Sequence, residues 1–246
     1  MLSHALILLY QVAGTIFFVL ALPYVILRAA RRPSEMRERL GWGRRSLRTR
    51  EGPLWVHAAS LGELRAVAGL GAGAVGGAAG NVAVKTAEGG GEHPFASGRS
   101  FALPILVTVL SVSARPQAAG AAPRGSVVSF APLDLWLALI PFVLRHRPRG
   151  LLLFETELWP FTLWLLRRFG IPVAVVSGRL SQRRWPRTRR LRPLLRDLLR
   201  GVDLVAAQGK GDAERFVFLG AKRVEVAGNL KYRPVTPPAE LPGFSA

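Results

Sequence analysis

Short apolar runs that alternate with amphipathic stretches limit most strongly how this chain can fold. Six such runs recur from Pro53 onward: residues 53–59, 104–110, 150–155, 171–177, 203–208 and 223–228. Their apolarity is continuous, which is typical of strands covered on both faces. The stretches between them have a helical period and mostly end in basic residues or glycine: 134–147, 158–170, 193–201 and 211–220. This order predicts an α/β fold with a doubly wound parallel sheet and right-handed crossovers.

An apolar run of 23 residues without a charge, Ala5 to Leu27, precedes this pattern. At about 1.5 Å per residue, a helix of this length would cross a hydrocarbon core of roughly 30 Å. A cleaved signal peptide would carry positive charge before the run, whereas here the arginines follow it. Nine arginines lie between Arg28 and Arg50, so the positive-inside rule places the rest of the chain in the cytoplasm. We therefore predict a single-pass membrane anchor over residues 1–30; the alternative is a buried core helix.

The net charge of +19, from 34 Lys and Arg against 15 Asp and Glu, indicates an anionic partner. A phosphate-bearing substrate, an acidic membrane surface and nucleic acid all satisfy this charge. The basic run at 179–196 could be a solvated helix face, a contact with lipid phosphates or a nucleic-acid patch. Because the chain also has a predicted anchor, contact with a lipid surface is favoured. The absence of cysteine excludes disulfides, thiolate metal sites and cysteine nucleophiles. Of the four histidines, only His57 lies near residues that could take part in a reaction. We therefore expect no histidine metal cluster.

Residues 66–100 interrupt the pattern with a low-complexity stretch that is rich in glycine and alanine. Its one GxG tract, Gly69 to Gly73, has no strand directly before it, and the run does not match the phosphate-binding pattern GxxxxGK[ST]. We interpret it as an insertion or flexible loop.

Polar residues follow three of the predicted strands. Ser60 and Glu63 come after the first, Glu155 ends the run at 150–155 with Glu157 just after it, and Lys231 comes after the last. Since ligands of open parallel sheets bind beyond the carboxyl ends of the strands, we expect these side chains on one edge. Glu63 and Glu157 have a simpler alternative reading as first-turn charges that favour a helix N-terminus by ~0.3 to 1 kcal/mol. Glu155 ends an apolar strand, and a partly desolvated acid there needs a partner.

Four ordered motifs carry a resemblance to a known family: WVHAASLGE (55–63), LLLFETELWP (151–160), IPVAVVSGRLS (171–181) and VEVAGNLKY (224–232). Together with RERLGWG (37–43), they resemble the bacterial 3-deoxy-D-manno-octulosonic acid (Kdo) transferases of lipopolysaccharide synthesis. The resemblance implies half of a GT-B fold: a Rossmann-like acceptor domain at residues 31–233, then a truncated interdomain linker at 234–246. The CMP-Kdo domain is expected to lie outside this chain.

The resemblance also implies the roles of the site residues. Glu63 would be the general base, while Glu155 and Lys231 would stabilise the transition state. The partners would be a lipid A precursor, CMP-Kdo and the cytoplasmic face of the inner membrane, with no metal, cofactor or nucleic acid. A membrane-anchored module that binds the lipid A precursor without catalysis remains the alternative. A third class, nucleic-acid binding, has the charge but no recognisable motif.

Overall fold

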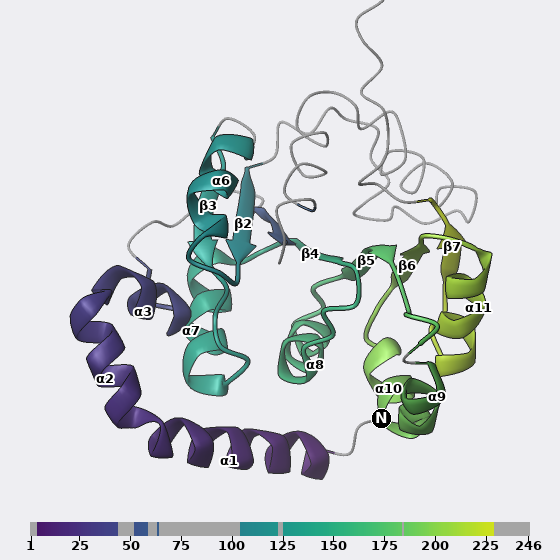
Figure 1. Ribbon diagram of the computed structural model, residues 1–246, viewed down its shortest axis with the longest axis horizontal. Helices are drawn as coiled ribbons and strands as arrows, with labels where there is room; N and C mark the ends of the chain where they lie inside the picture. Colours follow the sequence, from purple (N-terminus) through teal and green to yellow (C-terminus); the bar gives the residue numbers. More distant parts are fainter. Residues whose placement is uncertain are drawn as a thin grey trace, which may run out of the picture.

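The computed structural model describes residues 4–43, 52–58, 63, 104–122, 125–183 and 185–228. Its centre is a parallel sheet with the strand order β3-β2-β1-β4-β5-β6-β7 (Figure 1). The strands are β1 (Leu54–His57), β2 (Ile105–Val109), β3 (Val127–Phe130), β4 (Gly150–Phe154), β5 (Val173–Gly178), β6 (Leu204–Ala207) and β7 (Val224–Val226). The predicted α/β class with a Rossmann-like parallel sheet is confirmed. Strand β3 was not predicted, because its short, half-buried run lies at the sheet edge.

Helices cover both faces of the sheet. The four predicted helices are α7 (Trp136–His146), α8 (Pro160–Arg168), α10 (Arg192–Leu199) and α11 (Lys210–Leu219), and they share one core cluster with Trp55 of β1. The opposite cluster contains Val56 of β1 and residues of α6 (Ala114–Ala121), a helix that the sequence did not predict. The basic run folds into the short helix α9 (Trp185–Thr188), the 3-10 turn η3 (Arg189–Leu191) and α10.

The N-terminal apolar run forms two helices, not the single helix expected over Ala5 to Leu27. Helix α1 (His4–Leu20) and helix α2 (Leu22–Arg31) meet at a bend of 64°. Pro23 explains the break, because its ring lacks an N–H and clashes with the carbonyl one turn earlier in a continuous helix. Among the described residues no single helix is long and apolar enough to cross a bilayer, although α1 and α2 pass that test as a bent pair.

Helix α1 lies along one side of the domain, below α7, α8 and α10 in Figure 1. Two polar side chains hold it there. The Tyr10 hydroxyl donates to Asp134 Oδ2 at 3.0 Å, and Gln11 Nε2 donates to the Asp134 carbonyl at 3.1 Å. The outer face remains exposed, with Leu9 64% and Leu20 75% accessible. Helix α1 therefore has one face docked on the domain and one large apolar face free of it.

Helix α3 (Pro33–Arg39) joins this pair to the edge of the sheet. Glu38 accepts a hydrogen bond from the Phe130 N–H of β3 at 2.9 Å and pairs with Arg115 of α6 at 2.6 Å. The guanidinium groups of Arg39 and Arg115 each lie 4.8 Å from the centre of the Phe130 ring. These contacts give the RERLGWG motif a structural role, because they anchor the N-terminal helices to β3.

Gly41 in the same motif packs directly against α7, and its replacement by alanine is expected to destabilise the domain by about 2 kcal/mol or more. Its φ is +80°, a region that costs alanine ~1 to 2 kcal/mol. A Cβ there would also lie 2.1 Å from the Ala138 carbonyl oxygen. Chemical unfolding in detergent measures the loss. Gly125→Ala is the matched control, because Gly125 has φ +83° but no heavy atom within 4 Å of the added Cβ. An equal effect of the two substitutions would contradict a role of Gly41 in packing.

Candidate active site

The strand order reverses between β1 and β4, which makes their carboxyl ends the switch point of the sheet. Strand β1 pairs with β2 on one side and with β4 on the other, and His57 lies opposite Leu153. In open α/β sheets ligands bind in the crevice at this point. Glu63 follows β1, and Glu155 with Glu157 follows β4, so the sequence places all three carboxylates beside the switch point. Glu63 is in helical conformation and only 3% exposed.

The electrostatics of Glu157 place this carboxylate near both Glu63 and Glu155. Burial raises the pKa of Glu157, and the negative charges of Glu63 and Glu155 raise it further. Glu157 lies in the turn between β4 and α8, not in the first turn of the helix as predicted, because α8 begins at Pro160. A helix-dipole role therefore does not explain Glu157. Clustered carboxylates with a raised pKa are typical of sites that transfer protons.

Backbone strain is concentrated at the same edge of the sheet. Glu155 has φ +59° directly after β4, and Ser177 has φ +53° within β5. Residues with a side chain rarely adopt this left-handed region, and they cluster at functional sites. The Glu155 N–H nevertheless donates to the Val176 carbonyl at 3.0 Å, so the sheet holds the strained backbone in place. The position of the Glu155 side chain is thus set by a turn that is hydrogen-bonded to β5.

His57 ends β1 with a buried, neutral ring. The Trp55 indole N–H donates to the Thr108 hydroxyl at 2.8 Å, and this hydroxyl lies 2.9 Å from Nδ1 of His57. Because Thr108 accepts from Trp55, its own proton can point to Nδ1, which favours the tautomer with the proton on Nε2. In the part of the chain that the structure describes, Nε2 has no hydrogen-bond partner. The ring packs edge-on against Trp159, with 6.2 Å between the centroids.

The buried His57 ring predicts a stability that falls in mild acid. Burial lowers the pKa of His57 to about 4, whereas an unfolded histidine titrates near 6.5. The unfolded chain therefore binds more protons between these values, and the free energy of unfolding should fall by roughly 2 kcal/mol from pH 7 to pH 5 through this residue. Urea unfolding at both pH values of the wild type and of His57→Asn measures the difference, because asparagine can still accept from Thr108 but does not titrate. Identical pH dependence in the two proteins would contradict the assignment.

A family model described as 3-deoxy-D-manno-octulosonic-acid transferase (kdotransferase) matches residues 96–233, which is more than half of the chain. The chain belongs to this family. It is 34% identical over 194 residues to the 3-deoxy-D-manno-octulosonic acid transferase of Bordetella pertussis, covering 77% of this chain and 40% of that protein. The enzyme of the same name from Chlamydia pneumoniae is 28% identical over 228 residues, which cover 90% of this chain and 47% of that protein.

A third relative is the probable mitochondrial 3-deoxy-D-manno-octulosonic acid transferase of Arabidopsis thaliana. It is 32% identical over 134 residues, which cover 53% of this chain and 30% of that protein. The chain thus spans less than half the length of these curated relatives.

Two predicted site residues of this Kdo transferase domain, Ser60 and Lys231, lie outside the described residues. Strand β7, which precedes Lys231 in the chain, ends at Val226 and is separated from β4 by β5 and β6. The catalytic roles given to Glu63, Glu155 and Lys231 stay predictions.

Asp134 is a buried acid whose importance the sequence did not reveal. It accepts from the backbone N–H groups of Phe161 at 2.9 Å and Thr162 at 2.7 Å, and from the Thr162 hydroxyl at 2.6 Å. It thereby caps α8, the helix that follows Glu155 and Glu157. Burial raises the pKa of Asp134 although these donors act in the opposite direction. In the sequence, Asp134 stands just before α7, where an acid indicates a cap of that helix. In the structure it caps α8 instead, which comes later in the chain.

Proposed function

We propose that this chain is the acceptor-binding half of an inverting glycosyltransferase that moves Kdo from CMP-Kdo to a hydroxyl of a lipid A precursor. The observation that carries the proposal is the buried Glu63 beside Glu155 and Glu157 at the switch point of a sheet in this family. Since this chain spans less than half the length of these relatives, we place the donor site in the part of their length that it does not cover.

In the proposed reaction, Glu63 takes the proton of the acceptor hydroxyl while its oxygen attacks the anomeric carbon and the phosphate of CMP leaves. Because the acceptor oxygen attacks one face of the anomeric carbon and the phosphate leaves from the opposite face, the configuration at this carbon is inverted. Burial and the negative charges of Glu63 and Glu155 raise the pKa of Glu157, so this residue is more easily protonated than an isolated glutamate. Glu155 and Lys231 complete the proposal as the groups that stabilise charge in the transition state.

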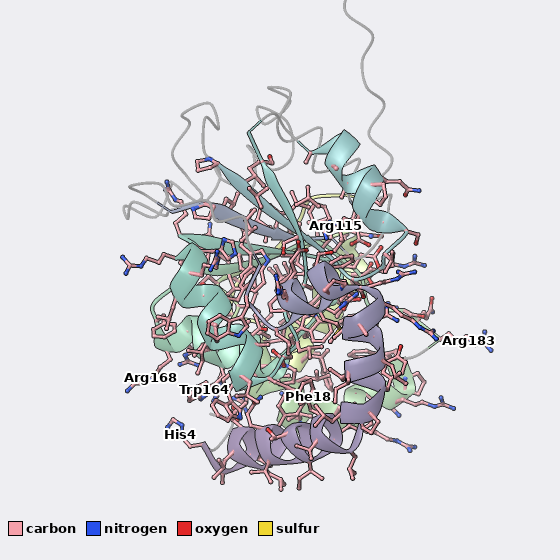
Figure 2. All side chains as sticks on the ribbon, turned by 90° about the vertical axis from the view of Figure 1, so that its left-hand side faces the viewer. His4, Phe18, Arg115, Trp164, Arg168 and Arg183 are labelled. Atoms are coloured by element: carbon pink, nitrogen blue, oxygen red, sulfur yellow. The ribbon has the colours of Figure 1, made fainter. Side chains whose placement is uncertain are left out.

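The same proposal places the domain on the cytoplasmic side of the inner membrane, attached through α1 and α2. The outer face of α1 is exposed and apolar, as the side chains pointing away from the domain in Figure 2 illustrate. Helix α2 ends in Arg28 and Arg31, and basic residues next to an apolar helix favour the side of the membrane with anionic lipids. A membrane attachment would bring the site to a lipid-borne hydroxyl.

Membranes that contain the 246-residue chain joined to a donor-binding half, supplied with CMP-Kdo and the lipid A precursor, test the proposal. Transfer of Kdo to the precursor would support the enzyme. Binding of the precursor without transfer would favour the second candidate, a module that holds the lipid. A chain that neither transfers Kdo nor binds the precursor would overturn both. Sedimentation of the chain with vesicles, compared with a variant that lacks residues 1–31, tests the membrane attachment separately.

A further inference from the structure

A cavity of about 560 Å³ lies in the angle between α1 and α2, on the side that faces the domain. Phe18 and Val25 line it from the two helices, while Leu133 and Leu135 line it from the segment before α7. Figure 2 shows Phe18 on the domain side of α1, within this angle. The volume is in the range of cavities that bind small ligands, and the lining is mostly apolar. The shape and chemistry fit a hydrocarbon chain.

One end of the cavity carries excess positive charge. Arg28 and Arg39 line it, and both donate to Glu35 Oε1, at 2.8 Å and 2.9 Å. Arg32 lies 3.7 Å from the other oxygen of Glu35. Three guanidinium groups therefore surround one carboxylate, which leaves two positive charges in this cluster. An occupant of the cavity that matches this charge carries an anionic group next to its apolar part.

One lining residue of the cavity also contacts the candidate active site. Trp159 is part of the lining, and its ring meets the ring of His57 edge-on. Trp159 follows Glu157 by two residues, in the short segment between β4 and α8. An apolar chain in the cavity would thus lie against Trp159, whose ring meets His57 at the end of β1.

We propose that this cavity holds an acyl chain of the anionic lipid acceptor and so places the acceptor's head group between the arginine cluster and Glu63. This inference rests on the proposed function. The bend between α1 and α2 has a role in it, since a straight helix would not enclose the space against Leu133 and Leu135. In this arrangement the outer face of α1 contacts the bilayer, and the cavity lies against the opposite face of the same helix. The lipid can therefore enter the cavity from the bilayer.

Binding to the purified 246-residue chain in phosphatidylcholine nanodiscs tests the proposal with two probes. One is a tetra-acylated, bisphosphorylated glucosamine disaccharide, and the other is the same disaccharide without acyl chains. Ala21→Phe and Val25→Phe fill the cavity and should weaken binding of the acylated probe by about tenfold or more, since each excluded methylene costs about fourfold. Binding of the deacylated probe should not change.

Ala13→Phe and Ile26→Phe are the matched controls, because both residues are exposed on the same helices and line no cavity described for this chain. They should bind both probes as the wild type does. Equal binding of the acylated probe by all four variants would overturn the proposal and leave the proposed function intact. Displacement of the acylated probe by an equal amount of phosphatidylglycerol, an anionic phospholipid that the nanodiscs lack, would also overturn it, because the cavity would then hold any anionic membrane lipid. A wild type that binds neither probe would overturn the proposed function itself.

Discussion

Replacing Asp134 by alanine is expected to lower the free energy of unfolding by about 3 to 5 kcal/mol. The substitution removes the acceptor for the first free N–H groups of α8, those of Phe161 and Thr162, and for the Tyr10 hydroxyl of α1. Each buried donor left without a partner costs ~1 to 3 kcal/mol. One change therefore weakens both the helix after the candidate site and the docking of the N-terminal helix.

Thermal or urea unfolding in detergent measures this effect, with two variants that separate its parts. Tyr10→Phe removes only the contact to α1 and should cost about 1 kcal/mol. Glu225→Ala removes a partly exposed ion pair between Arg223 and the edge strand β7 and should change stability by less than about 1 kcal/mol. If Asp134→Ala were no more destabilising than Glu225→Ala, Asp134 would not be the link between α1 and α8.

In the chain joined to a donor-binding half, replacing Glu63 by glutamine is expected to reduce Kdo transfer by about 10² to 10⁴-fold while the lipid A precursor still binds. Glutamine has nearly the same shape but cannot accept the proton of the acceptor hydroxyl. Glu214→Gln on α11 is the control, because Glu214 is exposed and follows β6, away from the switch point. Transfer by Glu63→Gln at the wild-type rate would remove Glu63 from the proposed mechanism.

A second measurement tests the geometry around Glu63 without any transfer reaction. Because the charge of Glu63 contributes to the raised pKa of Glu157, Glu63→Gln should lower that pKa. A titration of the side-chain carboxyl resonances by NMR detects the shift, and Glu214→Gln should leave it unchanged. A Glu157 pKa that is the same in Glu63→Gln and the wild type would show that the two carboxylates are not coupled.

The sheet and the carboxylate cluster were predictable because they follow from local signals. Continuous apolar runs identified β1 and β4, and the rule that ligands bind at carboxyl ends placed Glu63 and Glu155 on one edge. The short strand β3 and the alanine-rich helix α6 gave no such signal. Pro23 indicates a break in the helix near Ala21, but the length of the apolar run favoured the prediction of one continuous helix.

The contacts of Asp134 could not be predicted, because they depend on tertiary structure. Tyr10 and Asp134 are 124 positions apart, and the sequence has no periodicity that pairs them. The same holds for Glu38 of α3, which meets Phe130 across 92 positions. Such pairs form only when the sheet has brought its helices into place, so a single sequence shows the residues but not their partners.

The contact between α1 and Asp134 also has a consequence for synthesis of the protein. The ribosome must add 124 residues after Tyr10 before its partner exists, which takes roughly 6 to 25 seconds at typical rates. During this time the apolar helix α1 has no domain to pack against. In the membrane attachment proposed above, α1 would therefore meet lipid before it docks on the domain.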